Sequence, residues 1–189
     1  MNSCALLIEF VIAFMLSGYA QPAMAEDETS SSTAAKEIPD LRGMFLTQSA
    51  RSFGIVPTQE HPRVWAVLME MGYPEGSATL LAVVDGSVSL YTSTVGGILG
   101  AGGYPSVRRK AMEFLNTAEQ YLEEFQKTSE YPLPGPGRTK FYLMTFSGTF
   151  TGDFDENDLG EGHHKLSKLF YAGQDVLSDL QRRAPLNQR

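Results

Sequence analysis

The sequence is almost without cysteine, since Cys4 is the only one among its 189 residues. Beyond this position no disulfide can form, and no metal site can use thiolate ligands. Catalytic or redox chemistry at a thiol is likewise excluded for the rest of the chain. A fold without cysteine suits an oxidising or a reducing compartment equally, so this absence does not decide where the protein works.

Positive charge is also scarce, with 15 Lys and Arg against 22 Asp and Glu and a formal net charge of −7. The longest basic run is Arg108-Arg109-Lys110. Nucleic acids and anionic lipids bind to dense basic surfaces, and an acidic protein repels them. We therefore expect no nucleic-acid partner.

The common signatures of catalytic and nucleotide-binding sites are missing. The chain has no Gly-x-Ser-x-Gly, no His-Glu-x-x-His and no Gly-Lys-Ser/Thr ending of a P-loop. Its three histidines are His61, His163 and His164. We expect a protein that is not an enzyme and carries no cofactor.

The N-terminal part has the order of an export signal. An apolar run over 5–16 precedes Ala-Met-Ala and an acidic, Ser/Thr-rich stretch, which predicts a signal peptide over 1–25 and a disordered linker over 26–37. The apolar run is shorter than the ~20 residues of a membrane span. We expect an exported, periplasmic protein with no stable membrane span. The alternative is a cytoplasmic protein whose start is wrongly assigned and which begins further along, for example at Met44.

The remaining residues, 38–185, predict a single α+β domain. The apolar run from Val64 to Met71 indicates a strand with both faces covered. Asp85-Gly86 stands between two β-rich runs, which predicts a two-residue type I′ hairpin with Gly86 at positive φ. A second hairpin is expected around Ser147-Gly148.

Apolar residues at helical spacing predict two long amphipathic helices, over 107–125 and 166–180. A shorter helix is expected over 41–53, closed by Gly54. These elements predict an antiparallel sheet of about five strands in two hairpin-containing blocks, with the two long helices packed on one face.

This order of elements, with Asp85-Gly86 between the early strands and a leucine-rich helix at the end, resembles the roadblock and dynein-light-chain domains among the profilin-like folds. The resemblance implies a non-enzymatic interaction or scaffold domain. Its free sheet face or edge strand would bind a protein partner or a second copy in a homodimer. The stretch from Val64 to Tyr91 also resembles bacterial proteins, a resemblance that implies no function.

The alternative function is binding of a small ligand or anion at the glycine-rich loop over 95–103. Free N–H groups and the dipole at the start of the following helix attract anions, and basic residues lie in its first turns. The candidate anion-binding residues are Gly100, Gly102, Gly103, Arg108, Arg109 and Lys110. The other interpretation is a flexible connector beside a solvated basic corner.

The acidic loop over 153–164 is a candidate metal site, because carboxylates bind calcium or magnesium and carboxylates together with imidazoles bind zinc or iron. The candidate ligands are Asp158, Glu161, His163 and His164. The loop does not follow the EF-hand pattern. The other interpretation is a solvated turn whose acidic residues favour the start of a helix.

Overall fold

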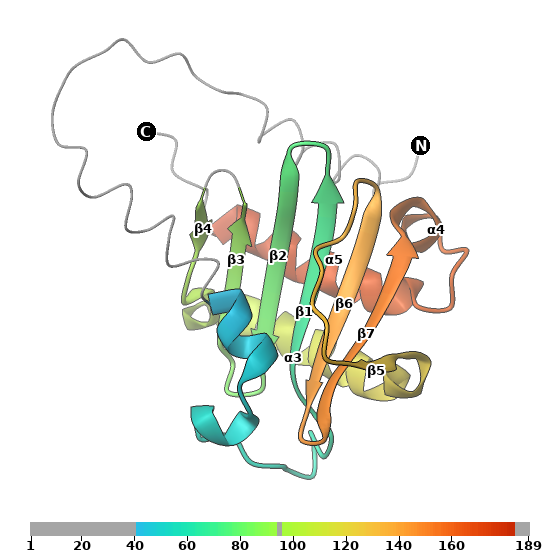
Figure 1. Ribbon diagram of the computed structural model, residues 1–189. Helices are drawn as coiled ribbons and strands as arrows, with labels where there is room; N and C mark the ends of the chain where they lie inside the picture. Colours follow the sequence, from blue (N-terminus) through green and yellow to red (C-terminus); the bar gives the residue numbers. More distant parts are fainter. Residues whose placement is uncertain (1–40, 94–95, 184–189) are drawn as a thin grey trace, which may run out of the picture.

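The computed structural model describes residues 41–93 and 96–183, which form a sheet with helices on both of its faces (Figure 1). Neighbouring strands are antiparallel and follow the order β4-β3-β2-β1-β6-β7-β5. The strands are β1 (Val64–Tyr73), β2 (Gly76–Val83), β3 (Val88–Thr92), β4 (Gly96–Ile98), β5 (Gln126–Thr128), β6 (Arg138–Thr145) and β7 (Gly148–Asp155). The helices are α3 (Pro105–Tyr121), α4 (Glu156–Gly160) and α5 (Ser167–Arg183), with a further helix over 41–47 and the 3-10 helices η1 (Ala50–Phe53), η2 (Ala101–Gly103) and η3 (Leu122–Glu124).

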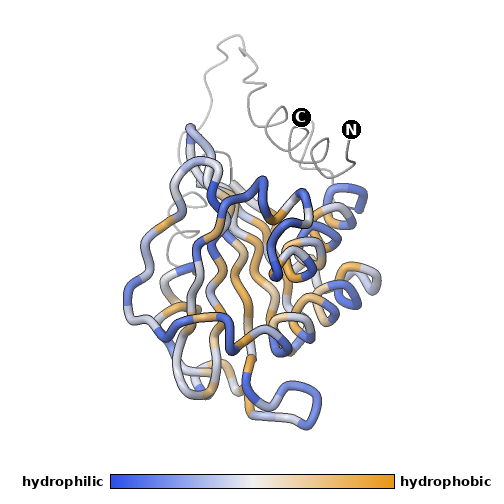
Figure 2. The backbone as a smooth tube through the Cα atoms, turned by 90° about the vertical axis from the view of Figure 1, so that its right-hand side faces the viewer, coloured by the Kyte–Doolittle hydropathy of each residue, from blue (hydrophilic) through white to orange (hydrophobic). Residues whose placement is uncertain are grey.

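The first face of the sheet is covered by α3 and α5. Each helix turns one apolar stripe to the strands, so that hydrophobic positions gather where helices and sheet meet (Figure 2). Phe114 and Phe170 are fully buried there against Met69 and Leu143 of the central strands. This confirms the two long amphipathic helices on one face and places the main core between them and the sheet.

The number of elements differs from the prediction. The α+β class and the antiparallel sheet are confirmed, but the sheet has seven strands rather than about five, and α4 and the helix over 41–47 accompany the two long helices. The two additional strands, β4 and β5, lie at the sheet's edges and are three residues each. Such short segments show no alternation of apolar and polar residues, and β4 lies in a glycine-rich run that is unfavourable for strands.

Four residues, 84–87, separate β2 from β3, and the hydrogen bond between Val83 and Ser87 leaves a turn of three residues, 84–86. The N–H of Gly86 donates to the carbonyl of Val83 at 2.8 Å, and the N–H of Val83 donates to the carbonyl of Ser87 at 3.0 Å. Gly86 has φ 88°, which is the glycine position of a bulged three-residue hairpin. The positive φ is confirmed, while the two-residue type I′ turn is wrong by one residue.

The second face of the sheet is covered by two segments far apart in the sequence. The helix over 41–47 and η1 lie in front of the strands, and the connection over 129–137 runs across the same face (Figure 1). Leu46 and Ala50 pack on Trp65 and Met144 in a second, smaller apolar cluster. The predicted helix over 41–53 is therefore a helix followed by a 3-10 turn, and Gly54 closes it with φ 71° as expected.

Within residues 41–93 and 96–183, no helix is both long and apolar enough to cross a membrane. The predicted signal peptide and linker lie outside the described residues.

Candidate functional site

The second face carries a row of polar side chains across five strands. Cross-strand pairing places Tyr91, Thr79, Glu70, Lys140 and Asp153 side by side from β3 to β7. The carboxylate of Glu70 lies at the centre of the row on β1 and is fully buried. Burying a carboxylate costs folding free energy unless the carboxylate is paired with a cation and hydrogen-bonded. The partner of Glu70 therefore indicates the role of this row of side chains.

That partner is Arg42, which comes from the helix over 41–47. Its Nε lies 2.5 Å from Oε1 of Glu70 and its Nη2 lies 2.9 Å from Oε2, a two-point pairing. The same Nη2 donates to the carbonyl of Tyr131 at 2.9 Å, and the guanidinium lies 5.6 Å from the ring centre of Tyr142. One arginine thus ties both covering segments to the centre of the sheet.

The tyrosines near this pair keep their protons. Burial, with a smaller contribution from Glu70, raises the pKa of Tyr142 to about 12, and its hydroxyl donates to the carbonyl of Pro132 at 2.6 Å. Burial also raises the pKa of Tyr91, whose hydroxyl has no hydrogen-bond partner in the described part of the chain. The hydroxyl of Tyr142 thus ties the connection over 129–137 to the sheet, and neither tyrosine ionises to act as a base near neutral pH.

A cavity of about 490 Å³ opens on the same face, towards the turn between β6 and β7. One wall is the segment over 46–57 and the other is the segment over 127–131. Trp65 and Met144 line it from the strands and belong to the apolar cluster beneath the first wall. Pockets of roughly 300–1,000 Å³ are the usual size for small-molecule sites.

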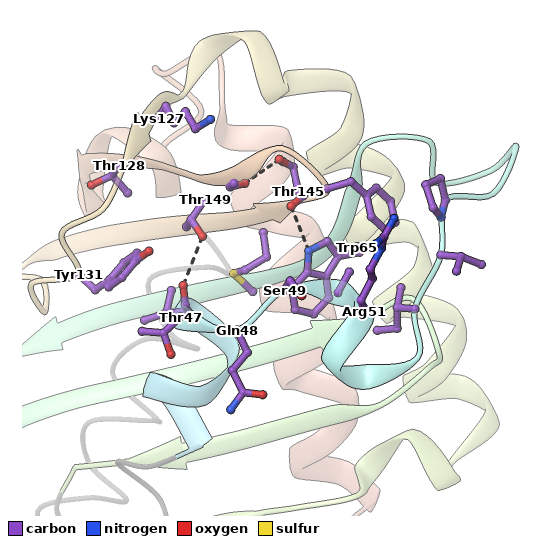
Figure 3. A pocket seen from close by; sticks show the side chains of 18 residues that line it. Thr47, Gln48, Ser49, Arg51, Trp65, Lys127, Thr128, Tyr131, Thr145 and Thr149 are labelled. Atoms are coloured by element: carbon purple, nitrogen blue, oxygen red, sulfur yellow. Dashed lines mark hydrogen bonds between the residues drawn. The ribbon is translucent and has the colours of Figure 1, made fainter.

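Hydrogen bonds at the strand ends fix the shape of this cavity (Figure 3). The indole N–H of Trp65 donates to the carbonyl of Thr145 at 3.2 Å, which holds the ring in place. The hydroxyl of Thr145 donates to the carbonyl of Gly148 at 2.6 Å and closes the turn. The hydroxyl of Thr149 reaches the carbonyl of Leu46 across the cavity at 3.5 Å, a long contact between sheet and wall.

The lining of the cavity is amphipathic and free of acidic residues. Apolar side chains such as Leu46 and Ile55 alternate with hydroxyl groups, and two cations, Arg51 on η1 and Lys127 on β5, belong to it. None of its 18 residues is Asp or Glu, although the chain has 22 of them. Because the protein as a whole is acidic, this is a local reversal of charge.

The glycines predicted to bind an anion instead serve the turn between β3 and α3. Gly100 has φ 71°, a conformation that favours glycine. A Cβ on Gly102 would lie 1.9 Å from the carbonyl oxygen of Gly86, so this glycine lets η2 approach the β2–β3 loop. Gly103 has open space around it. These roles are structural and leave anion binding there a prediction.

The three predicted cations do not converge. Nη2 of Arg108 donates to the carbonyl of Asp85 at 2.8 Å, and Nζ of Lys110 donates to the carbonyl of Asp175 on α5 at 3.2 Å. Arg109 is exposed and has no partner among the described residues. Two of the three cations therefore contact other parts of the protein, Arg108 the β2–β3 loop and Lys110 the helix α5.

The start of α3 already has a carboxylate beside it. Ser106 in its first turn donates to Asp179 of α5, and this hydrogen bond is the main reason that the pKa of Asp179 lies below its ordinary value. Asp179 is 4% exposed and also contacts Arg182 and Arg183. An external anion would have to approach this buried negative charge.

The four predicted metal ligands are not gathered around one point. Asp158 lies within α4, and Glu161 contacts Nδ1 of His163 at 3.3 Å. His164 accepts a backbone N–H at Nδ1 and lies against Phe154, with ring centres 4.9 Å apart. In the part of the chain that the structure describes, no three His, Cys, Asp or Glu side chains are placed to hold a metal ion.

A second buried carboxylate, Glu156, lies on the helix-covered side at the first position of α4. Its Oε2 accepts a hydrogen bond from the hydroxyl of Thr139 at 3.1 Å. Burial, with a smaller contribution from Asp155, raises its pKa to about 7, although the Thr139 bond acts in the opposite direction. This carboxyl group is neutral over part of the range in which an ordinary glutamate is charged.

In comparisons with protein-family models, curated proteins and solved structures, no match is found. The resemblance to roadblock domains therefore stays a prediction that rests on the order of elements.

The cavity was not among the sites predicted from sequence. Its two cations, Arg51 and Lys127, are 76 residues apart and belong to no motif. Both η1 and the three-residue β5 are too short for their positions in the fold to be read from local pattern. The usable signal in the sequence is the single tryptophan, Trp65, the second residue of the buried strand β1, which lines the cavity.

Proposed function

We propose that this domain is a non-enzymatic binding protein for a small organic ligand, and that the ligand occupies the cavity on the second face of the sheet. The observation that supports this most strongly is the cavity itself: about 490 Å³, with an apolar floor, several hydroxyl groups and walls from two separate segments. Apolar surface with a few polar groups is the usual composition of a small-molecule site.

The arrangement of polar groups around the cavity supports binding rather than catalysis. Its lining contains no His, Cys, Asp or Glu, the side chains that most often act as acid, base or nucleophile. The nearby Glu70 and Arg42 are fully engaged with one another. A ligand held there would meet apolar contacts and hydrogen bonds, and the only lining side chains of the usual acid–base types are Lys127 and Tyr131.

The shape of the sheet gives less support to protein binding through a sheet edge or face. Both edge strands, β4 and β5, are three residues long, and a partner strand would find few backbone groups to pair with. The second face is covered by the segments over 41–53 and 129–137. The leading hypothesis from sequence therefore ranks below ligand binding.

Trp65 provides a direct test, because it is the chain's single tryptophan and lines the cavity. In this test, the hydrophobic dyes anilinonaphthalene sulfonate and N-phenylnaphthylamine are titrated separately into the full-length protein. Binding in the cavity places either dye beside Trp65, so excitation of tryptophan will produce dye emission that saturates at one dye per protein.

A matched pair of variants locates the binding. Ser49 and Ser52 are both exposed and lie at and within η1, but only Ser49 lines the cavity, and its side chain makes no capping hydrogen bond. Ser49→Phe should fill the cavity and lower dye affinity at least tenfold, because the added ring takes ligand volume. Ser52→Phe should leave affinity unchanged. Equal affinities for the two variants would refute the cavity as the binding site.

A further inference from the structure

Four cations in the described part of the chain make no hydrogen bond or ion pair: Arg51, Arg109, Lys127 and Lys168. The others contact carboxylates or backbone carbonyls. Arg51 and Lys127 both line the one cavity described above, while Arg109 lies on α3 and Lys168 on α5. In a chain of net charge −7, unpaired cations around an acid-free cavity are a distinctive combination.

We propose that the ligand is an organic anion: a molecule with an apolar body and a carboxylate, sulfonate or phosphate group. This inference rests on the proposed function and adds the chemical class of the ligand. The body packs on Trp65 and Met144, and the acidic group takes a hydrogen bond from Arg51 or Lys127.

Two features of the lining support an acidic group over a neutral one. No carboxylate in the lining competes for either cation. A bound anion therefore forms an ion pair with Arg51 or Lys127 without displacing an existing one. Among the hydroxyl groups of the lining, that of Ser49 makes no hydrogen bond within the described residues and offers a further donor. A neutral apolar ligand would leave both cations without a partner.

The positions of the two cations indicate an elongated ligand. Lys127 comes from β5 at one side of the cavity and Arg51 from η1 at the other, with Thr149, Thr145 and Trp65 between them in the view of Figure 3. A ligand whose acidic group reaches one of these cations extends its body along the floor towards the other. An anion without an apolar body, such as inorganic phosphate, would contact one cation and leave the floor empty.

The two dyes test the ligand class, because they share their aromatic frame and differ in the sulfonate. We expect the wild-type protein to bind anilinonaphthalene sulfonate roughly five- to tenfold more tightly than N-phenylnaphthylamine, as a partly exposed charge-assisted hydrogen bond allows. The double variant Arg51→Gln/Lys127→Gln should lose this preference and keep its affinity for the neutral dye.

A control variant removes two cations of the same kind elsewhere. Arg109→Gln/Lys168→Gln changes the net charge equally at exposed positions on α3 and α5, and it should keep the preference for the sulfonate dye. Equal binding of both dyes by the wild type, or an unchanged preference in the cavity variant, would overturn the ligand class while leaving the cavity as a binding site. Absence of binding by either dye would overturn the proposed function as well.

Discussion

On the α3 and α5 side of the sheet, the side chains that leave the strands are buried and nearly all apolar, and the helices pack over them. The second face buries a glutamate and two tyrosine hydroxyls in or near its apolar cluster, pairs the glutamate with a partly exposed arginine, and retains a cavity. The same strands supply both faces. The first face therefore contributes most of the hydrophobic stabilisation, and the second is where the fold departs from close packing.

The two buried glutamates show the same contrast. Glu70 on the second face has a full counter-charge in Arg42, whereas Glu156 on the helix side has only a hydroxyl partner and a pKa of about 7. A buried charge with a counter-charge holds the element that carries its partner in place. A buried carboxyl without a counter-charge changes its protonation state within the ordinary pH range. The pair on the second face holds the wall of the cavity.

The largest difference in the free energy of unfolding is expected between substitutions at two neighbouring residues of β6 whose side chains point to opposite faces. Leu143→Ala should lower the free energy of unfolding by about 3–4 kcal/mol, because Leu143 is fully buried among close-packed residues. Met144→Ala should cost only about 1–2 kcal/mol, since Met144 already borders the cavity. Chemical denaturation measures both, and equal losses would remove the distinction between the faces.

The ion pair on the second face should behave as a unit. Arg42→Met leaves Glu70 buried without a counter-charge and should cost about 3 kcal/mol. The double variant Arg42→Met/Glu70→Leu removes both charges and should recover most of that loss. Thermal or urea denaturation tests this, and a double variant as unstable as the single one would show that the pair is not a self-contained contact.

Glu156 should make stability depend on pH. A carboxyl whose pKa rises on folding binds its proton more tightly when folded, so its contribution is full below the ordinary value of 4.5 and is lost as pH rises towards 7. Glu156→Gln should therefore stabilise the protein by about 3 kcal/mol at about pH 8.

The same substitution should make almost no difference near pH 4, where both side chains are neutral. Urea denaturation across this range gives the difference between wild type and variant at each pH. A difference that stays constant from acid to alkaline pH would contradict the raised pKa.

The smallest effect is expected at the loop where the helix-covered side meets the β2–β3 turn. Gly86→Val should cost about 1–2 kcal/mol, because φ is 88° and a Cβ would lie 2.3 Å from Cζ of Arg108. Gly103→Ala is the control, since its Cβ would meet no neighbour. Melting temperatures that change equally would contradict the requirement for glycine at position 86.

The parts of the fold that could be predicted from sequence are those with a long local pattern. The strand at Val64, both hairpins and the two helices follow from periodicity and turn residues. The edge strands β4 and β5 could not be predicted because three residues carry no period. Nor could the three-residue form of the β2–β3 loop, because Gly86 suits either loop length.

The cavity could not be predicted because it depends on packing between distant segments. The contact between Arg42 and Glu70 joins residues 28 apart, and the one between Thr149 and Leu46 joins residues 103 apart. The glycine-rich loop is a more obvious candidate for a binding site in the sequence than the cavity, because its residues are consecutive. Within and after this loop, Gly102 and Arg108 contact the β2–β3 loop and Lys110 contacts α5.

The measurement that tests the central claim most directly is an experimental structure of the full-length protein with bound anilinonaphthalene sulfonate. We predict the naphthalene ring against Trp65 and Met144 inside the cavity, with the sulfonate within hydrogen-bonding distance of Arg51 or Lys127. A dye bound at the start of α3 beside Arg109, or along an edge strand with the cavity empty, would contradict the account.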